Sequence, residues 1–140
     1  MYFGPVNFNL KYKISPCGGP IYDTEGTISS PSYPNNYSSD LDCAWLLILP
    51  IGMTIKITFE DLELEPSCSD YVTIKNGRSH DSPLIGQYCG NNKPDKAIVS
   101  EGHTMLIEFH SDSKNQKKGF KIRYEPSTSG MRKINITTSD

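Results

Sequence analysis

The sequence predicts an all-β protein, either a sandwich or a barrel, on two observations. Apolar residues recur at every second position in stretches along the whole chain, and clusters of turn-forming residues separate those stretches. No window shows the apolar stripe of an amphipathic helix. Many short strands joined by frequent turns are typical of packed or closed antiparallel sheets.

The alternation is the pattern of a strand with one buried face. Apolar side chains occupy every second position from Ile55 to Phe59, with polar residues between them. An immunoglobulin fold ranks second, because its tryptophan belongs on the strand after the first core cysteine, whereas Trp45 follows Cys43 by two residues. The other alternating stretches are residues 6–14, 72–75, 105–109 and 120–124, and the Gly-, Pro- or Asn-containing turns are residues 31–34, 76–77 and 90–92.

The length of 140 residues fits one core domain with short flanking segments. Residues 8–12 resemble residues 120–124, so segment 1–16 is predicted to be the last strand of a preceding similar domain, or else an edge strand of this one. Residues 126–140 are rich in Ser and Thr and are predicted to form a flexible tail or linker. The N-terminus lacks a signal-peptide pattern, so an extracellular chain would be a fragment of a longer protein.

The composition argues against nucleic acid and membrane partners. Lys and Arg number 14 against 16 Asp and Glu, so no basic excess is available to neutralise phosphates. The longest apolar run, residues 44–49, ends at Pro50 and is far shorter than the roughly 18 residues that span a bilayer. We therefore expect a chain that neither crosses a membrane nor binds nucleic acid.

The four cysteines indicate an extracellular, disulfide-bonded protein. No two of them form a C-x-x-C pair, which disfavours zinc. Four cysteines allow three pairings, of which the simplest without nesting joins Cys17 to Cys43 and Cys68 to Cys89. Glycosylation sequons, which point to the same compartment, begin at Asn36 and Asn135.

Catalysis is not predicted. The sequence contains neither G-x-S-x-G nor H-E-x-x-H, and His80, His103 and His110 are each expected on a turn or an exposed strand face. The neighbouring acids Glu60 and Glu63 are commoner as solvated residues than as a catalytic pair. We therefore expect a protein that is not an enzyme.

The chain resembles the CUB domain family in a series of short motifs. They are Cys17-Gly18-Gly19, Gly26-Thr27-Ile28-Ser29-Ser30-Pro31, Tyr33-Pro34-Asn35-Asn36-Tyr37, Cys43-Ala44-Trp45, Cys68-Ser69-Asp70-Tyr71, Tyr88-Cys89-Gly90 and Gly119-Phe120. The resemblance spans residues 17–125 and implies a jelly-roll-like β-sandwich of two antiparallel sheets, with disulfides from the first to the second and from the third to the fourth cysteine. CUB domains usually serve as recognition modules in proteases, endocytic receptors and sperm-surface proteins.

The resemblance extends to the calcium-binding subset of the family, and it implies a metal site in this chain. On that match the carboxylates of Glu63, Asp70 and Asp112 are ligands of Ca²⁺. Hard Ca²⁺ prefers six to eight oxygen ligands, and three carboxylates supply enough negative charge to hold it. Without a cation, the same three charges would repel one another.

The resemblance also implies supporting roles for nearby residues. Tyr37 is expected to orient the glutamate, while the backbone carbonyl near Ser113 and the side chain of Asn115 complete the oxygen shell. In the family, the metal fixes the carboxylates so that their free oxygens accept a Lys or Arg side chain from a protein partner. We therefore expect a calcium-dependent recognition module that binds a protein ligand presenting Lys or Arg, with neighbouring CUB domains or a second copy of the chain as further partners.

A calcium-independent function is the alternative. In it, the chain binds an anionic glycan through Lys114, Lys117 and Lys118, or it spaces or dimerises its parent protein through an exposed sheet edge. Metal dependence separates the two functions.

Overall fold

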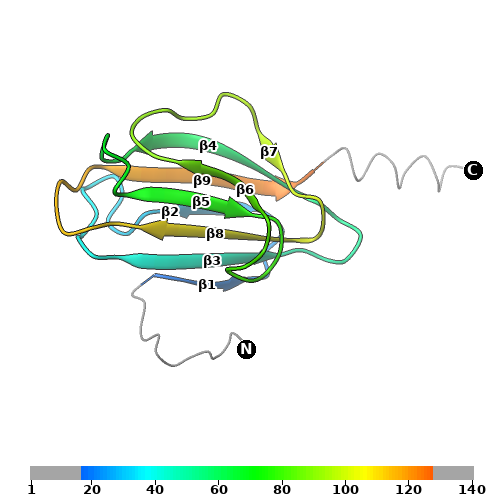
Figure 1. Cartoon of the computed structure of the whole chain (residues 1–140). Helices are drawn as coiled ribbons and strands as arrows, with labels where there is room; N and C mark the ends of the chain where they lie inside the picture. Colours follow the sequence, from blue (N-terminus) through cyan, green and yellow to red (C-terminus); the bar gives the residue numbers. More distant parts are fainter. Residues whose placement is uncertain (1–16, 128–140) are drawn as a thin grey trace, which may run out of the picture.

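The computed structural model describes residues 17–127 and shows two packed β-sheets, with no helix among these residues (Figure 1). The five-stranded sheet has the order β1 (Gly18–Ile21), β3 (Asp42–Ile48), β8 (Thr104–His110), β5 (Tyr71–Lys75) and β6 (Leu84–Tyr88). The four-stranded sheet has the order β2 (Gly26–Ser29), β9 (Gly119–Pro126), β4 (Ile55–Glu63) and β7 (Ile98–Val99). The predicted all-β sandwich is therefore confirmed.

All paired strands are antiparallel except β1 and β3, which run parallel. Within the described part of the chain, no helix is long and apolar enough to cross a membrane. The alternating stretches predicted at 55–59, 72–75, 105–109 and 120–124 lie in β4, β5, β8 and β9, which confirms these strands.

Aromatic side chains join the two sheets in the core. The ring of Phe120 on β9 meets Phe109 of β8 at a centroid distance of 5.1 Å and Trp45 of β3 at 5.8 Å, both edge to face. Such pairs add roughly 0.5–1.5 kcal/mol beyond the burial of their area. Because β3 and β8 are in one sheet and β9 is in the other, these contacts fix how the sheets are stacked.

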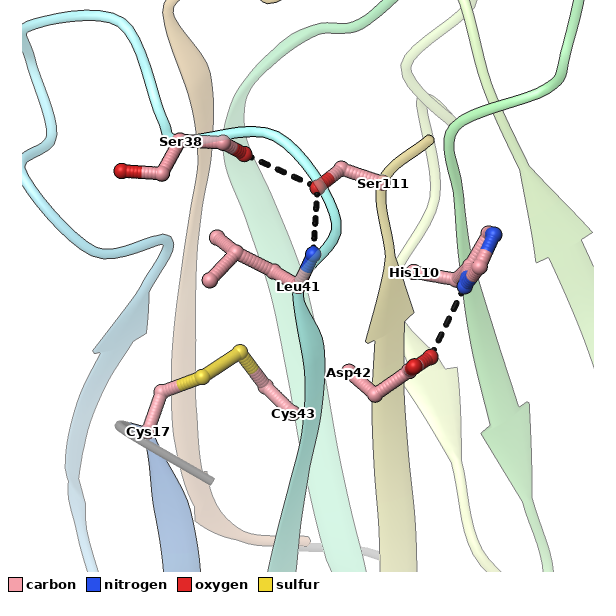
Figure 2. The surroundings of a disulfide bond; sticks show 7 residues. All are labelled: Cys17, Ser38, Leu41, Asp42, Cys43, His110 and Ser111. Atoms are coloured by element: carbon pink, nitrogen blue, oxygen red, sulfur yellow. Dashed lines mark hydrogen bonds and ion pairs between the residues drawn. A yellow bond between two sulfur atoms is a disulfide. The ribbon is translucent and has the colours of Figure 1, made fainter. Parts of the chain in front are cut away.

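The two disulfides are Cys17–Cys43 and Cys68–Cys89, which confirms the un-nested pairing. The first ties the start of the parallel strand β1 to β3 (Figure 2). The second ties the loop after β4 to the residue that follows β6. Within the described residues, no cysteine is free.

The ordered sandwich extends past the predicted boundary at residue 125. Pro126 still pairs with Ile55 in the four-stranded sheet, and the backbone N–H of the buried Ser127 donates to the carbonyl of Thr54 at 2.8 Å. The predicted extra strand at 6–14, the rest of the predicted tail and the sequon at Asn135 lie outside the described residues.

The loop between β5 and β6 folds back over the outer face of the five-stranded sheet (Figure 1). Lys75 on β5 forms an ion pair with Glu108 on β8 at 2.8 Å and donates to the backbone carbonyl of His80 in the loop at 2.7 Å. His80 also contacts Glu108, with Nδ1 at 2.7 Å from the carboxylate. This covering loop explains how Lys75, on the solvent side of a strand, is buried.

Candidate metal centre

Three loops meet at one end of the sandwich, on the left in Figure 1. They join β2 to β3, β4 to β5, and β8 to β9. The second and third bring together the carboxylates of Glu65, Asp70 and Asp112, and one oxygen atom from each lies within 4.8 Å of the other two. This is the candidate functional site, and from here on it is called the acidic cluster.

Asp70 is the buried centre of the acidic cluster, with 0% of its surface exposed. Its Oδ2 accepts a hydrogen bond from the Tyr37 hydroxyl at 2.6 Å, and its Oδ1 accepts one from the backbone N–H of Asp112 at 2.7 Å. Burial raises the pKa of Asp70, and the charge of Asp112 adds to this rise, although the two hydrogen bonds oppose it. The folded protein therefore bears an electrostatic cost for keeping this carboxylate ionised.

Tyr37 links the first loop to the acidic cluster. Its ring is buried edge-on against Phe109 at 5.0 Å, and its backbone N–H donates to the carbonyl of Lys117 at 3.0 Å. Burial, followed by the hydrogen bond to Asp70, raises the pKa of Tyr37, so the hydroxyl stays protonated and acts as a donor. The sequence predicts that Tyr37 orients a glutamate, whereas in the structure its hydroxyl donates to Asp70.

The glutamate of the acidic cluster is Glu65, whereas the sequence predicts Glu63 as the ligand. Glu63 is exposed at the end of β4, where strand alternation turns Leu62 inward and Glu63 outward. Beyond β4 the chain leaves the sheet, and the backbone N–H of Leu64 donates to the carbonyl of Gly90 instead. Glu65 is then 7% exposed and faces Asp70 and Asp112.

Asp112 lies beside Asp70, as the sequence predicts. Its Oδ1 accepts the backbone N–H of Lys114 at 3.0 Å, and this bond is the main reason why the pKa of Asp112 is lowered. The preceding residue, Ser111, anchors the strand end by accepting the N–H of Leu41 and donating to the carbonyl of Ser38, each at 2.9 Å (Figure 2). The backbone of Asp112 is thus fixed on both sides.

The other two predicted ligands, Ser113 and Asn115, are exposed in the same loop. The amide Nδ2 of Asn115 donates to Glu65 Oε2 at 2.8 Å, which places this side chain at the acidic cluster. Asn115 adopts a positive φ of 57°, a conformation that asparagine tolerates better than most residues. Ser113 adjoins Asp112 in the chain.

One oxygen atom of the acidic cluster has no partner. Glu65 Oε1 is buried and accepts no hydrogen bond from the protein, while Oε2 meets the Asn115 amide. A buried carboxylate oxygen without a donor is costly unless a cation or a donor satisfies it. Because every side-chain donor atom of the acidic cluster is an oxygen, the site suits a hard divalent cation such as Ca²⁺.

The remaining residues singled out in the sequence lie around or away from this site. Asn36 is exposed, as a glycosylation acceptor must be, and its Nδ2 is 3.4 Å from the carbonyl of Gln116. His80 is on an exposed turn, and His110 is partly exposed on β8, where its Nδ1 lies 2.8 Å from Asp42 (Figure 2). His103 is partly buried in the turn before β8.

Comparison with known proteins identifies the family. The sequence model of the CUB domain family matches residues 17–124. Human Cubilin is 42% identical over 128 residues, a match that covers 89% of this chain and 4% of Cubilin. The full extracellular region of zebrafish Gpr126/Adgrg6 gives a TM-score of 0.70 at 36% identity, covering 81% of this chain and 15% of that one. The MASP-1 CUB2 domain bound to Ca²⁺ gives a TM-score of 0.67 at 30% identity, and the match covers 80% of this chain and 99% of that domain.

The match to Cubilin spans only a small fraction of that protein's length. The Gpr126/Adgrg6 match is to an extracellular region, and the two disulfides of this chain fit the same compartment, which confirms the predicted extracellular location. The family match runs from the first cysteine through the last strand of the described sandwich. This chain therefore belongs to the CUB domain family.

Proposed function

We propose that this extracellular CUB domain is a calcium-dependent recognition module that docks Lys or Arg side chains of a protein partner. The observation that carries the proposal is the acidic cluster with its unpartnered Glu65 Oε1. The similarity to a CUB2 domain bound to Ca²⁺ supports calcium as the ion. No catalytic role is part of the proposal.

In this proposal, some residues bind the ion directly and others orient the residues that bind it. Glu65, Asp70 and Asp112 hold the ion by their carboxylates, and Asn115 contributes its amide oxygen after the amide turns away from Glu65 Oε2. When bound, Ca²⁺ supplies the positive charge that offsets the repulsion among the three carboxylates. Tyr37 keeps Asp70 oriented through its hydroxyl.

Docking uses the carboxylate oxygens that remain accessible at the rim of the site. Asp112 is partly exposed and precedes an exposed loop, so an incoming ammonium or guanidinium group can reach its carboxylate. Such contacts are charge-assisted hydrogen bonds, stronger than neutral ones and weakened by salt. A single contact of this kind binds weakly, so tight binding requires several modules that act together, such as neighbouring CUB domains or a homodimer.

A direct test compares Glu65→Ala with Glu63→Ala in calorimetric titrations with Ca²⁺. The two substitutions remove the same charge from positions two residues apart, but only Glu65 belongs to the acidic cluster. We expect Glu65→Ala to abolish measurable Ca²⁺ binding and Glu63→Ala to retain affinity within about threefold, a long-range charge effect. Equal loss in both variants, or no Ca²⁺ binding by the unaltered protein, would contradict the proposal.

The alternative of a glycan site on the three lysines has less support. Lys118 is engaged, because its Nζ lies 2.7 Å from the carboxylate of Asp61. Only Lys114 and Lys117 of the predicted triplet remain for an anionic ligand, and two surface lysines attract anions only weakly. We therefore favour the calcium-dependent function.

A further inference from the structure

Tyr33, Asp61 and Lys118 form a compact cluster beside the metal centre, called here the clamp. The Tyr33 hydroxyl donates to Asp61 Oδ2 at 2.5 Å, and Lys118 Nζ lies 2.7 Å from the same oxygen. Lys118 Nζ also lies 5.7 Å from the centroid of the Tyr33 ring, within cation–π range. The three side chains are thus mutually in contact.

The clamp joins three segments that are distant in the sequence. Tyr33 is in the loop between β2 and β3, Asp61 is on β4, and Lys118 is the last residue before β9. A bulge between Phe59 and Asp61 shifts the register of β4 against β9. Asp61 is therefore displaced from the regular alternation of the strand at the point where it meets the two loop residues.

The charges of the clamp reinforce one another. The hydrogen bonds from Lys118 and Tyr33 lower the pKa of Asp61, and the bond to Asp61 raises the pKa of Tyr33 and of Lys118. All three groups therefore stay in the protonation states that maintain the contacts near neutral pH. The clamp thus links the two loops to β4.

Both loops held by the clamp carry parts of the metal centre. The β2–β3 loop supplies Tyr37, which orients Asp70, and the β8–β9 loop supplies Asp112 and Asn115. The two loops are joined along their length by backbone hydrogen bonds from Tyr37 N–H to the carbonyl of Lys117 at 3.0 Å and from Asp40 N–H to the carbonyl of Asp112 at 2.9 Å. The clamp closes the end of this loop pair that lies nearest β9.

We propose that Tyr33, Asp61 and Lys118 are positioning residues for the metal centre, holding the two loops in the arrangement that brings Asp112 and Asn115 to Glu65. This inference rests on the proposed function. None of the three residues belongs to the acidic cluster, so their effect on a bound ion would be transmitted through the loop backbone.

The direction in which Ca²⁺ affinity changes when a clamp side chain is removed separates a positioning role from a purely electrostatic one. Removing the positive charge of Lys118 makes the surroundings of the cluster more negative, which by itself strengthens the binding of a cation. Loss of the clamp predicts weaker binding instead. Tyr33→Phe changes no charge, so a purely electrostatic effect predicts unchanged Ca²⁺ affinity. A positioning role predicts lower Ca²⁺ affinity in this variant.

The experiment measures Ca²⁺ affinity by calorimetric titration and the melting temperature without Ca²⁺, for Tyr33→Phe, Lys118→Gln and Lys118→Arg. Lys121→Gln is the matched control, because the side chain of Lys121 on β9 is as exposed as that of Lys118, at 41% against 39%, and likewise forms an ion pair with a β4 carboxylate, that of Glu60. We expect Ca²⁺ affinity to fall roughly two- to fivefold in Tyr33→Phe and Lys118→Gln. Lys118→Arg should retain most of the Ca²⁺ affinity of the unaltered protein. The Ca²⁺ affinity of Lys121→Gln should not fall.

Unchanged affinity in Tyr33→Phe, or tighter binding in Lys118→Gln, would overturn the positioning role while leaving the calcium site in place. An equal fall in Lys121→Gln would also overturn it, because the effect would then be general to the sheet surface. A large fall in the calcium-free melting temperature of both clamp variants would assign the clamp to overall stability. Absence of Ca²⁺ binding by the unaltered protein would refute the proposed function itself.

Discussion

Asp70 and Tyr37 form the most deeply buried polar pair of the metal centre, and their chemistry is the simplest to test at the scale of single residues. The hydroxyl of Tyr37 is the donor to Asp70 Oδ2, and the ring of Tyr37 is held edge-on against Phe109. The hydrogen bond from Tyr37 therefore affects both the orientation of the Asp70 carboxylate and the free-energy cost of keeping it ionised.

Tyr37→Phe removes this donor and leaves the ring packed against Phe109. We expect a loss of about 1–3 kcal/mol in unfolding free energy without Ca²⁺, because a buried carboxylate oxygen loses its hydrogen bond. Ca²⁺ affinity should fall roughly tenfold or more, as it does when the partner of a metal ligand is removed. Urea unfolding and calcium titration measure the two effects.

Tyr71→Phe is the control for that variant, because Tyr71 adjoins Asp70 in the chain, but its half-exposed ring packs beside His110 and is not part of the acidic cluster. It should change both quantities little. If Tyr37→Phe matched this control, Tyr37 would have no orienting role.

The residue scale also shows where sequence reasoning reached its limit. Asp70, Asp112 and Asn115 could be predicted to gather, and the structure places all three at the site. The choice between Glu63 and Glu65 could not be predicted, because both have the same strand parity. It depends on the chain leaving β4 after Glu63, a tertiary feature held by the bond from Leu64 to Gly90.

At the scale of elements, the loop between β5 and β6 is fixed to β8 by a partly buried charge cluster. Burial tends to raise the pKa of Glu108, but hydrogen bonds and charges from His80 and Lys75 outweigh it, so the pKa lies below its ordinary value. A carboxylate with a lowered pKa in the folded protein adds stability above its unfolded pKa, and this stability is lost as the pH falls through the folded pKa.

Glu108→Gln should therefore lower the unfolding free energy by about 1–3 kcal/mol near neutral pH, because Lys75 is left buried without its counter-ion. The difference from the unaltered protein should shrink as the pH falls below the usual range of glutamate titration, where Glu108 becomes protonated in both states. Urea unfolding across this pH range is the measurement. A difference that does not depend on pH would show that the charge of Glu108 contributes nothing.

The strands differed in how well the sequence predicted them. The long central strands β4, β8 and β9 each contain a stretch of alternating residues, and each was predicted from it. The short strands β1, β2, β6 and β7 have two to five residues and lie at sheet edges, where one face or one side is solvated. Too few residues then alternate for periodicity to stand out. The parallel pairing of β1 with β3 begins directly after the Cys17–Cys43 bridge.

At the scale of the whole molecule, the acidic cluster and the end of the last described strand, at Pro126, are at opposite ends of the sandwich. The acidic cluster follows the end of β4, whereas Pro126 pairs with Ile55 at its start (Figure 1). Cys17, in contrast, is bridged to Cys43 at the metal-centre end.

Calcium-dependent binding of basic side chains is the central claim, and one surface-binding measurement tests it most directly. The protein is passed over an immobilised lysine-rich peptide in millimolar Ca²⁺ and then in chelator, with the same peptide carrying acetylated lysines as the control surface. We predict binding that requires both Ca²⁺ and free lysine ammonium groups and that weakens steeply with added salt. Binding that persists in chelator, or that ignores acetylation, would contradict the account.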